Sequence, residues 1–290
     1  MHLQVLRDLA NVIAIIFDQS WLLGEVPEDG RKVNVTPIIK IKKEDPGNHK
    51  LVSFTLFPGK VMKQLVLETI FRHMKDKNVI WSFPKDCSEI RAGSPSGIYV
   101  IQPTGLHPIV VYCEMNVTDG GWTVIQRNRQ STEITWAESW STYKYGFGNV
   151  HTEYWLGTEY IHQISRQKVY QVRFVIWDAA NNIKFTDYSL FSLEDESQGY
   201  RLRLGTYAGT AEDAMTSDNP RNVHNNMKFS TKDRDQDTYR GNCASSYGGG
   251  WWYSACYAVR LNVKGARTWC SLCNGNCKAS AILIKPALYH

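Results

Sequence analysis

The 290-residue sequence contains no run of eighteen apolar residues, so we expect no membrane-spanning helix. It also lacks a heptad pattern and a Gly-X-Y tract, repeats through which many extracellular chains assemble, and this leaves the oligomeric state open. A strong basic charge is missing as well. The net charge is +5, of which +3 precedes Lys85 (12 basic minus 9 acidic residues), so +2 is left for the remainder. A charge this small and dispersed argues against a nucleic-acid-binding face.

Motifs of the common catalytic sites are also absent. There is no Gly-x-Ser-x-Gly and no His-Glu-x-x-His, and the eight histidines show no spacing that pairs one with a nucleophile. Four acidic residues could be imagined as paired acids, but their polar surroundings indicate solvated carboxylates: Asp187, Glu194, Asp195 and Glu196. We therefore predict that the protein is not an enzyme.

No cysteine precedes Cys87, and all seven cysteines lie from that position onward. This asymmetry predicts two segments of different origin, residues 1–84 and residues 85–290. Because seven is an odd number, one cysteine is left unpaired or pairs between chains.

Three of the cysteines stand close together, in the order Cys270-x-x-Cys273-x-x-x-Cys277. A zinc site would need a fourth ligand, and no histidine stands nearby in the sequence. The favoured interpretation is a local disulfide with one thiol left over, and which two cysteines join stays open.

Residues 1–84 carry apolar side chains at helical spacing, first between Leu6 and Phe17 and again after Pro58. We therefore expect a short, mainly helical segment. The apolar run at residues 12–17 has only six residues and acidic neighbours, so it makes no convincing signal peptide.

The order of short motifs in this segment, including Leu23-Gly-Glu-Val-Pro-Glu-Asp and Asn34-Val-Thr-Pro-Ile-Ile-Lys, has a resemblance of its own. Residues 1–81 resemble the N-terminal part of a LINE-type retrotransposon reverse transcriptase. Such enzymes hold their metal-binding aspartates in later motifs that this chain does not reach, so no polymerase activity is implied. A fragment without the rest of its core is expected to pack loosely.

Residues 229–256 carry the strongest chemical signal in the chain. Asp233, Asp235 and Asp237 alternate, so three carboxylates crowd into five residues and repel one another. A hard divalent cation relieves such crowding, and calcium accepts carboxylate, carbonyl and water oxygens. An EF-hand is excluded, because counting from Asp233 gives Thr238 and Ala244 where that loop needs Gly and Glu. The alternative is a solvated acidic turn.

Cys243 and Cys256, thirteen positions apart, bracket three consecutive glycines and the pair Trp251-Trp252. Glycine reaches positive φ without steric cost, so the backbone can bend tightly here while the large rings anchor it. Two cysteines at this distance could staple such a loop.

This region resembles the calcium loop and glycine-tryptophan segment of the fibrinogen C-terminal domain, which fibrinogen, ficolins, tenascins, angiopoietins and fibrinogen-like proteins share. The resemblance covers residues 85–290. Further motifs follow in that family's order: Asp86-Cys-Ser-Glu-Ile, Cys113-Glu-Met, Asp119-Gly-Gly-Trp-Thr-Val-Ile-Gln-Arg, Tyr143-Lys-Tyr-Gly-Phe-Gly and Glu153-Tyr-Trp-Leu-Gly. It implies an α+β fold with a small disulfide-tied N-terminal subdomain, a central antiparallel sheet and a loop-rich calcium-binding subdomain.

The residue patterns agree with such a sheet. Residues 122–127 alternate like a strand, residues 169–177 indicate a strand buried on one face, and residues 200–204 indicate another with basic side chains outward. Two further strands are expected at residues 97–102 and 109–113. A short helix is expected at residues 159–167.

The resemblance also implies which cysteines pair and which residues bind the ion. It pairs Cys87 with Cys113 and Cys243 with Cys256. It assigns Ca²⁺ to the side chains of Asp235 and Asp237 and the backbone carbonyls of Tyr239 and Gly241, with Asp233 as a neighbour of the site.

The family's ligand surface lies beside that loop, and we expect it to involve Tyr247, Trp251, Trp252 and Tyr257. Members that bind acetyl groups usually carry His where this chain has Tyr257, and Asn where it has Arg260. We therefore predict an extracellular recognition module for a protein or glycoconjugate partner. A calcium-dependent lectin for acetylated sugars is the alternative.

Two glycosylation patterns occur, Asn34-Val-Thr and Asn116-Val-Thr. The first lies in the reverse-transcriptase-like segment, where chance explains it. The second precedes Asp119-Gly-Gly at an expected turn, so Asn116 is the predicted acceptor if the chain is secreted, as the resemblance implies.

Overall fold

The computed structural model describes residues 83–287, which lie in a compact unit spanning Ser82–His290. The helices and the reverse-transcriptase resemblance predicted for residues 1–81 fall outside the described residues. The boundary between residues 84 and 85 stays a prediction. Within residues 83–287, no helix is both long and apolar enough to cross a membrane.

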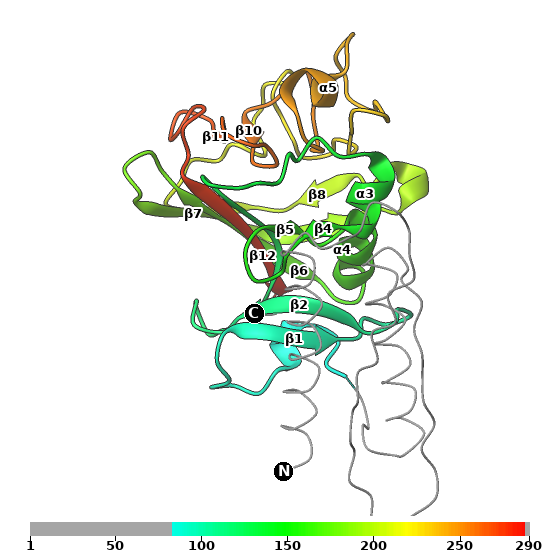
Figure 1. The fold of residues 1–290 in the computed structure, drawn as a ribbon, viewed down its shortest axis with the longest axis vertical. Helices are drawn as coiled ribbons and strands as arrows, with labels where there is room; N and C mark the ends of the chain where they lie inside the picture. The colour runs from blue at the N-terminus through cyan, green and yellow to red at the C-terminus, as the bar shows by residue number, and fades with distance from the viewer. Residues whose placement is uncertain (1–82, 288–290) are drawn as a thin grey trace, which may run out of the picture. The chain divides into compact units, whose positions relative to one another are not determined.

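A large antiparallel sheet forms the centre of this unit (Figure 1). Its main path runs β1-β2-β3-β12-β6-β7-β8. The strands in chain order are β1 (Gly97–Ile101), β2 (Ile109–Glu114), β3 (Trp122–Arg129), β6 (Tyr170–Trp177), β7 (Ile183–Leu193), β8 (Leu202–Leu204) and β12 (Ala279–Pro286). The last strand in the chain therefore lies in the middle of the sheet, between β3 and β6. The predicted central antiparallel sheet is confirmed.

Short strands extend the architecture. β4 (Phe147–Gly148) pairs with β5 (Tyr154–Trp155), β5 also pairs with β3, and β9 (Tyr207–Gly209) pairs with β7. A separate two-stranded sheet joins β10 (Val259–Arg260) and β11 (Thr268–Trp269). In Figure 1, β1 and β2 lie at one end of the described unit, and α5 lies at the other with β10 and β11 near it.

The described helices are short. They are η1 (Cys87–Glu89), α3 (Trp140–Tyr145), α4 (Thr158–Ser165), η2 (Glu196–Gln198) and α5 (Cys243–Tyr247). The Ser139 side chain caps the start of α3 by accepting from the Thr142 amide. The helix ends at Gly146, whose φ of 77° favours glycine and where a Cβ would lie 2.1 Å from the Leu156 carbonyl oxygen. Helix α4 occurs where residues 159–167 predicted one.

The burial of β6 follows its sequence pattern, with every second side chain from Tyr170 to Ile176 buried. The simple in-and-out alternation predicted for residues 122–127 is wrong, because β3 is buried on both faces from Trp122 to Gln126. The Gln126 amide donates to the Asn262 side chain at 3.0 Å, and the Asn128 amide donates to the Leu261 carbonyl at 2.7 Å. The loop that follows β10 therefore covers the polar face of β3.

Three of the four acidic residues expected to be solvated, Asp187, Glu194 and Glu196, are instead paired with basic groups, which corrects that expectation for them. Asp187 lies in β7 and accepts from Arg173 at 2.8 and 2.7 Å in a two-pronged contact. Glu194 pairs with Arg203, and Glu196 accepts from Lys144 at 2.6 Å. This hydrogen bond from Lys144 holds the pKa of Glu196 below its ordinary value. Asp195 caps the start of η2.

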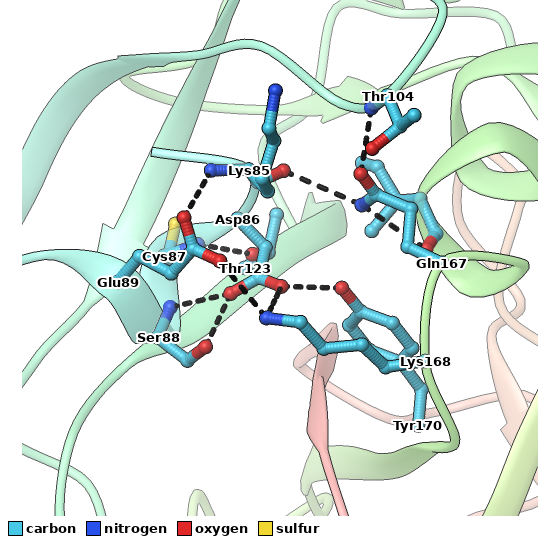
Figure 2. Close-up of polar contacts among 11 residues, drawn as sticks. Lys85, Asp86, Cys87, Ser88, Glu89, Thr104, Thr123, Gln167, Lys168 and Tyr170 are labelled. Carbon is cyan, nitrogen blue, oxygen red and sulfur yellow. Dashed lines mark hydrogen bonds and ion pairs between the residues drawn. The ribbon is translucent and has the colours of Figure 1, made fainter. Parts of the chain in front are cut away.

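A buried carboxylate joins the N-terminal end of the unit to β6 (Figure 2). Asp86 is fully buried and accepts from the Ser88 amide at 2.8 Å, which caps η1. From the other side, the Tyr170 hydroxyl donates to Asp86, and the Lys168 ammonium lies 3.5 Å from the same oxygen. Lys168 also bonds Glu89 at 3.0 Å. Because a buried charge needs several partners, this network fixes η1 against the sheet.

We expect Tyr170→Phe to lower the free energy of unfolding by about 2 kcal/mol, because Asp86 would lose a hydroxyl donor to a buried charge. The measurement is denaturant unfolding of the full chain. Tyr99→Phe is the matched control, since the Tyr99 hydroxyl donates at the surface to the Pro95 carbonyl. Equal losses in the two variants would show that the Asp86 network adds nothing special to stability.

Candidate functional site

The loop of residues 229–256 is anchored where its two arms meet. Ser230 and Trp251 form a backbone bridge, with N–O distances of 2.9 and 3.1 Å. Phe229 is fully buried and stacks on Trp155 of β5 at a ring distance of 5.8 Å. The loop is therefore fixed to the central sheet at its base.

Trp251 and Trp252 are 0% and 1% exposed, so they are core residues. The Trp252 indole donates to the Tyr200 carbonyl at 2.9 Å and packs against Phe229. The structure thus corrects the expectation that these two rings contact a ligand. They carry the loop, and of the predicted ligand-binding set only Tyr247 and Tyr257 keep accessible ring surface.

The glycines before the tryptophans are needed for close packing. Gly248 and Gly249 both have φ of 75°, a region that side chains rarely adopt. A Cβ on Gly249 would lie 1.6 Å from the Asn262 carbonyl oxygen. The loop can approach the residues after β10 only because this position has no side chain.

The structure contains the two cysteine pairs that the resemblance implied. Cys87 joins Cys113, which ties η1 to β2, and Cys243 joins Cys256, which ties α5 to the segment after the tryptophans. Cys273 joins Cys277, and Cys270 is a free thiol. A three-thiolate zinc site is therefore ruled out in this segment, and the local disulfide with one thiol left over is what the structure shows.

The Asp233 side chain makes structural hydrogen bonds. Its carboxylate accepts from the Thr231 hydroxyl and from the Trp140 amide at the start of α3, both at 2.8 Å. The side chain thus links the acidic loop to α3. Its predicted place as a neighbour of the calcium site rather than a ligand stays a prediction.

Asp235 and Asp237 lie together without a basic partner. The Asp237 amide donates to Asp235 at 3.2 Å, and the Asp237 carboxylate accepts from the amides of Tyr239 and Cys243, each at 2.8 Å. Burial, and to a lesser extent the neighbouring charge of Asp235, raises the pKa of Asp237. None of the ion pairs found within residues 83–287 includes either aspartate.

These residues suit a hard cation. The same short stretch of chain carries two carboxylates and the carbonyl oxygens of Tyr239 and Gly241, and these two oxygens accept no backbone hydrogen bond within the described part of the chain. The set offers only oxygen donors and two negative charges, as calcium prefers. No group of three or more His, Cys, Asp or Glu side chains in residues 83–287 could hold a metal. A site here would therefore depend on backbone oxygens.

The acidic loop is coupled to a pair of aromatic rings, of which Tyr247 is exposed and Tyr257 partly exposed. The Asp237 carboxylate accepts from the amide of Cys243, the first residue of α5. The last residue of α5 is Tyr247, whose side chain is 42% exposed. The Tyr247 ring lies 5.1 Å from the Tyr257 ring, edge to face. Tyr257 directly follows Cys256, the disulfide partner of Cys243. Both rings are thus held by elements that the acidic loop positions.

Arg260 makes this surface cationic. Its guanidinium carbon lies 4.8 Å from the Tyr257 ring centre and 5.7 Å from that of Tyr247. The same group donates to the carbonyls of Tyr247 at 3.1 Å and Ala266 at 2.9 Å, which fixes its position. In the sequence, Arg260 stands out only as a departure from the asparagine of acetyl-binding members. Its stacking on both rings requires the folded loop.

His224 is a supporting residue that the sequence did not reveal. It is fully buried and lies between the tryptophan loop and β10. Its Nδ1 lies 2.8 Å from the Trp252 carbonyl, and its Nε2 accepts from the amides of Ala258 at 3.1 Å and Val259 at 2.9 Å. Because a carbonyl only accepts, the neutral ring carries its proton on Nδ1. Burial lowers the pKa of His224 to about 4.

Asn116 lies exposed in the turn between β2 and β3. Its position is compatible with glycosylation, which stays a prediction.

Comparison with known proteins places these features in a family. The family described as fibrinogen beta and gamma chains, C-terminal globular domain, matches residues 83–275. The chain is 54% identical over 192 residues to a fibrinogen-like protein 1-like protein of Gallus gallus, a match that covers 66% of this chain and 68% of that protein. It is 45% identical over 174 residues to human angiopoietin-related protein 1, covering 59% of this chain and 34% of that protein.

Solved structures agree. The fibrinogen-like globe domain of human ANGPTL2 has a TM-score of 0.66 at 36% identity, covering 71% of this chain and all of that domain. A lamprey fibrin D-dimer has a TM-score of 0.67 at 28% identity, covering 80% of this chain and 86% of that one. The chain belongs to the fibrinogen C-terminal globular domain family. It spans about a third of the length of angiopoietin-related protein 1. The reverse-transcriptase resemblance stays a prediction.

Proposed function

We propose that the chain is a secreted, non-enzymatic recognition module that binds a protein or glycoconjugate partner through the surface formed by Tyr247, Tyr257 and Arg260. The observation that carries the proposal is that Tyr247 is exposed, Tyr257 and Arg260 are partly exposed, and all three are fixed by α5, by the Cys243–Cys256 disulfide and by the hydrogen bonds of Arg260. Tyrosine and arginine on rigid supports are typical of binding hot spots, because little side-chain entropy is lost on association.

We further propose that Asp235, Asp237 and the carbonyls of Tyr239 and Gly241 bind Ca²⁺. The ion would neutralise the two carboxylates and hold the loop that positions α5. A protein partner is supported by the likeness to the lamprey fibrin D-dimer, which is described as complexed with the peptide Gly-His-Arg-Pro-amide.

A lectin for acetylated sugars is the second candidate, favoured by the exposed ring of Tyr247 beside Tyr257. A neutral acetyl group needs an apolar slot with one or two fixed donors. The Arg260 guanidinium instead lies over both rings, which makes the surface charged. The recognition of a charged or hydrogen-bonding partner fits this arrangement better.

The test is binding of the labelled full chain to intact cells, measured by flow cytometry with soluble heparin present to suppress binding to sulfated glycans. We expect binding that requires calcium, is lost after protease treatment of the cells and falls at least about tenfold for Arg260→Gln. The control is Arg91→Gln, because Arg91 is exposed and lies between η1 and β1, away from this surface.

A parallel column of immobilised N-acetylglucosamine separates the two candidates. We expect the full chain to pass through it with calcium and with a chelator. Retention that a chelator releases would instead establish the acetyl-group lectin.

A further inference from the structure

A hollow of about 670 Å³ lies over the central sheet. It is lined by β2, by the second half of β3, by the start of β12, and by the end of β6 with the turn after it. None of its lining residues belongs to residues 229–256. A binding event here therefore does not depend on the proposed ion or on the surface around Tyr247.

The hollow results from a small residue in the central strand. Ala279 of β12 pairs with Arg129 of β3 on one side and with Trp177 of β6 on the other. Side chains paired across neighbouring strands point to the same face of a sheet. The short alanine side chain therefore leaves a trough between the long side chains of Arg129 and Trp177.

The walls carry uncompensated positive charge. Arg127, Arg129 and Lys278 line the hollow, and no ion pair found within residues 83–287 includes any of them. The carboxylate of Glu114 also lines it, but accepts from the Ser96 hydroxyl at 2.5 Å and the Asn116 amide at 2.9 Å. Three positive charges thus face one negative charge that is already hydrogen-bonded.

A second pocket on the sheet shows that this imbalance is particular to the larger hollow. The second pocket has a volume of about 370 Å³ and also contains an arginine and a lysine, Arg173 and Lys285. There, Asp187 binds Arg173 through both oxygens, and Asp119 supplies another negative charge. Its charges cancel, so it offers an anion no net attraction.

The remaining lining groups indicate the kind of anion. Tyr112 and Trp177 contribute aromatic surface, and the guanidinium carbon of Arg127 is held 4.2 Å from the Tyr112 ring centre. Gln130 and Asn181 add neutral amides that can bond hydroxyl groups. A volume of this size suits a ligand of a few rings. Sugar rings offer apolar faces to aromatic side chains, hydroxyls to amides and, when sulfated, negative charge to arginine and lysine.

We propose that this hollow is a binding site for a sulfated oligosaccharide, independent of calcium. The site goes beyond the recognition surface at Tyr247 and would give the domain a second, electrostatic attachment to a glycan chain. Because its charges are partly exposed, the affinity should fall steeply with ionic strength.

The test measures binding of the full chain to a heparin-derived hexasaccharide in chelator by surface plasmon resonance. The variant Arg127→Gln/Arg129→Gln/Lys278→Gln should raise the dissociation constant at least about tenfold, since charge-assisted contacts are lost. The matched control Arg91→Gln/Arg221→Gln/Lys232→Gln removes two arginines and one lysine that are exposed outside the hollow. It should change the dissociation constant less than about threefold. Melting curves verify that both variants fold.

Three results would overturn the proposal. These are a failure of the full chain to bind the hexasaccharide, an equal loss in the two triple variants, and equally tight binding of a polyglutamate peptide of the same charge. The last result would assign the hollow to an acidic protein segment. Because the assay contains chelator, none of these results bears on the calcium site or on the partner surface at Tyr247.

Discussion

Lowering the pH from about 7.5 to about 4.5 should destabilise the domain by about 2.5 kcal/mol through His224 alone. The ordinary histidine pKa of 6.5 applies to the unfolded chain, and burial lowers the folded value to about 4. Between these values the unfolded state binds a proton that the folded state does not. Stability from the neutral ring is therefore fully present above pH 6.5 and is lost as the pH falls toward 4.

Protonation would also place a hydrogen on Nε2, which could then no longer accept from the amides of Ala258 and Val259. The segment that carries Tyr257 should therefore loosen first. The measurement is urea unfolding at a series of pH values. His224→Gln should be less stable than the parent at neutral pH and should show a flatter pH dependence between about 6.5 and 4.5.

His151→Gln is the control, because His151 is exposed. It should retain the steep pH dependence of the parent. If His224→Gln retains it as well, carboxylates rather than His224 govern the acid transition.

The sequence predicts a strand's burial pattern well when only one face of the strand is buried. β6 shows its alternation because one face meets the core and the other does not. β3 does not, because the segment around Leu261 covers its second face with backbone carbonyls that Asn128 binds. The position of β12 between β3 and β6 was likewise hidden, since its partners lie more than one hundred residues earlier. Local patterns carry no information about such pairings.

The candidate site divides in the same way. Asp235 and Asp237 form a local motif, and each accepts a hydrogen bond from the amide two residues further along the chain. Trp251 and Trp252 were predicted to contact a ligand, but both are core residues. Trp252 packs against Phe229 and donates to the Tyr200 carbonyl, and these partners lie too far away in the sequence to be recognised there. His224 stands about thirty residues from the groups it bonds, at no recognisable spacing. Only the fold brings it to them.

Calcium should raise the melting temperature of the full chain. At a calcium concentration one hundred times the dissociation constant, the free energy of unfolding should rise by about 2.7 kcal/mol. Asp237→Asn should abolish this gain. In chelator the same variant should be at least as stable as the parent, because burial and Asp235 make the charge on Asp237 unfavourable without an ion. The asparagine side chain keeps an oxygen that can accept from Cys243. The measurement is thermal unfolding with calcium and with chelator.

Asp233→Asn is the matched control, since Asp233 bonds Thr231 and Trp140 instead of the proposed ion. It should lower the melting temperature in chelator and keep the full calcium gain.

The raised pKa of Asp237 also sets the sign of the pH effect. At pH values just above the ordinary pKa of 3.8, the folded state still binds a proton on Asp237 that the unfolded state has lost. In chelator, this group therefore lowers the stability of the fold as the pH rises through that range. Calcium binds only the ionised form, so its gain should shrink as the pH falls into the same range. An equal calcium gain in Asp237→Asn and the parent would refute the ligand assignment, and no gain in either would show that the loop binds no calcium.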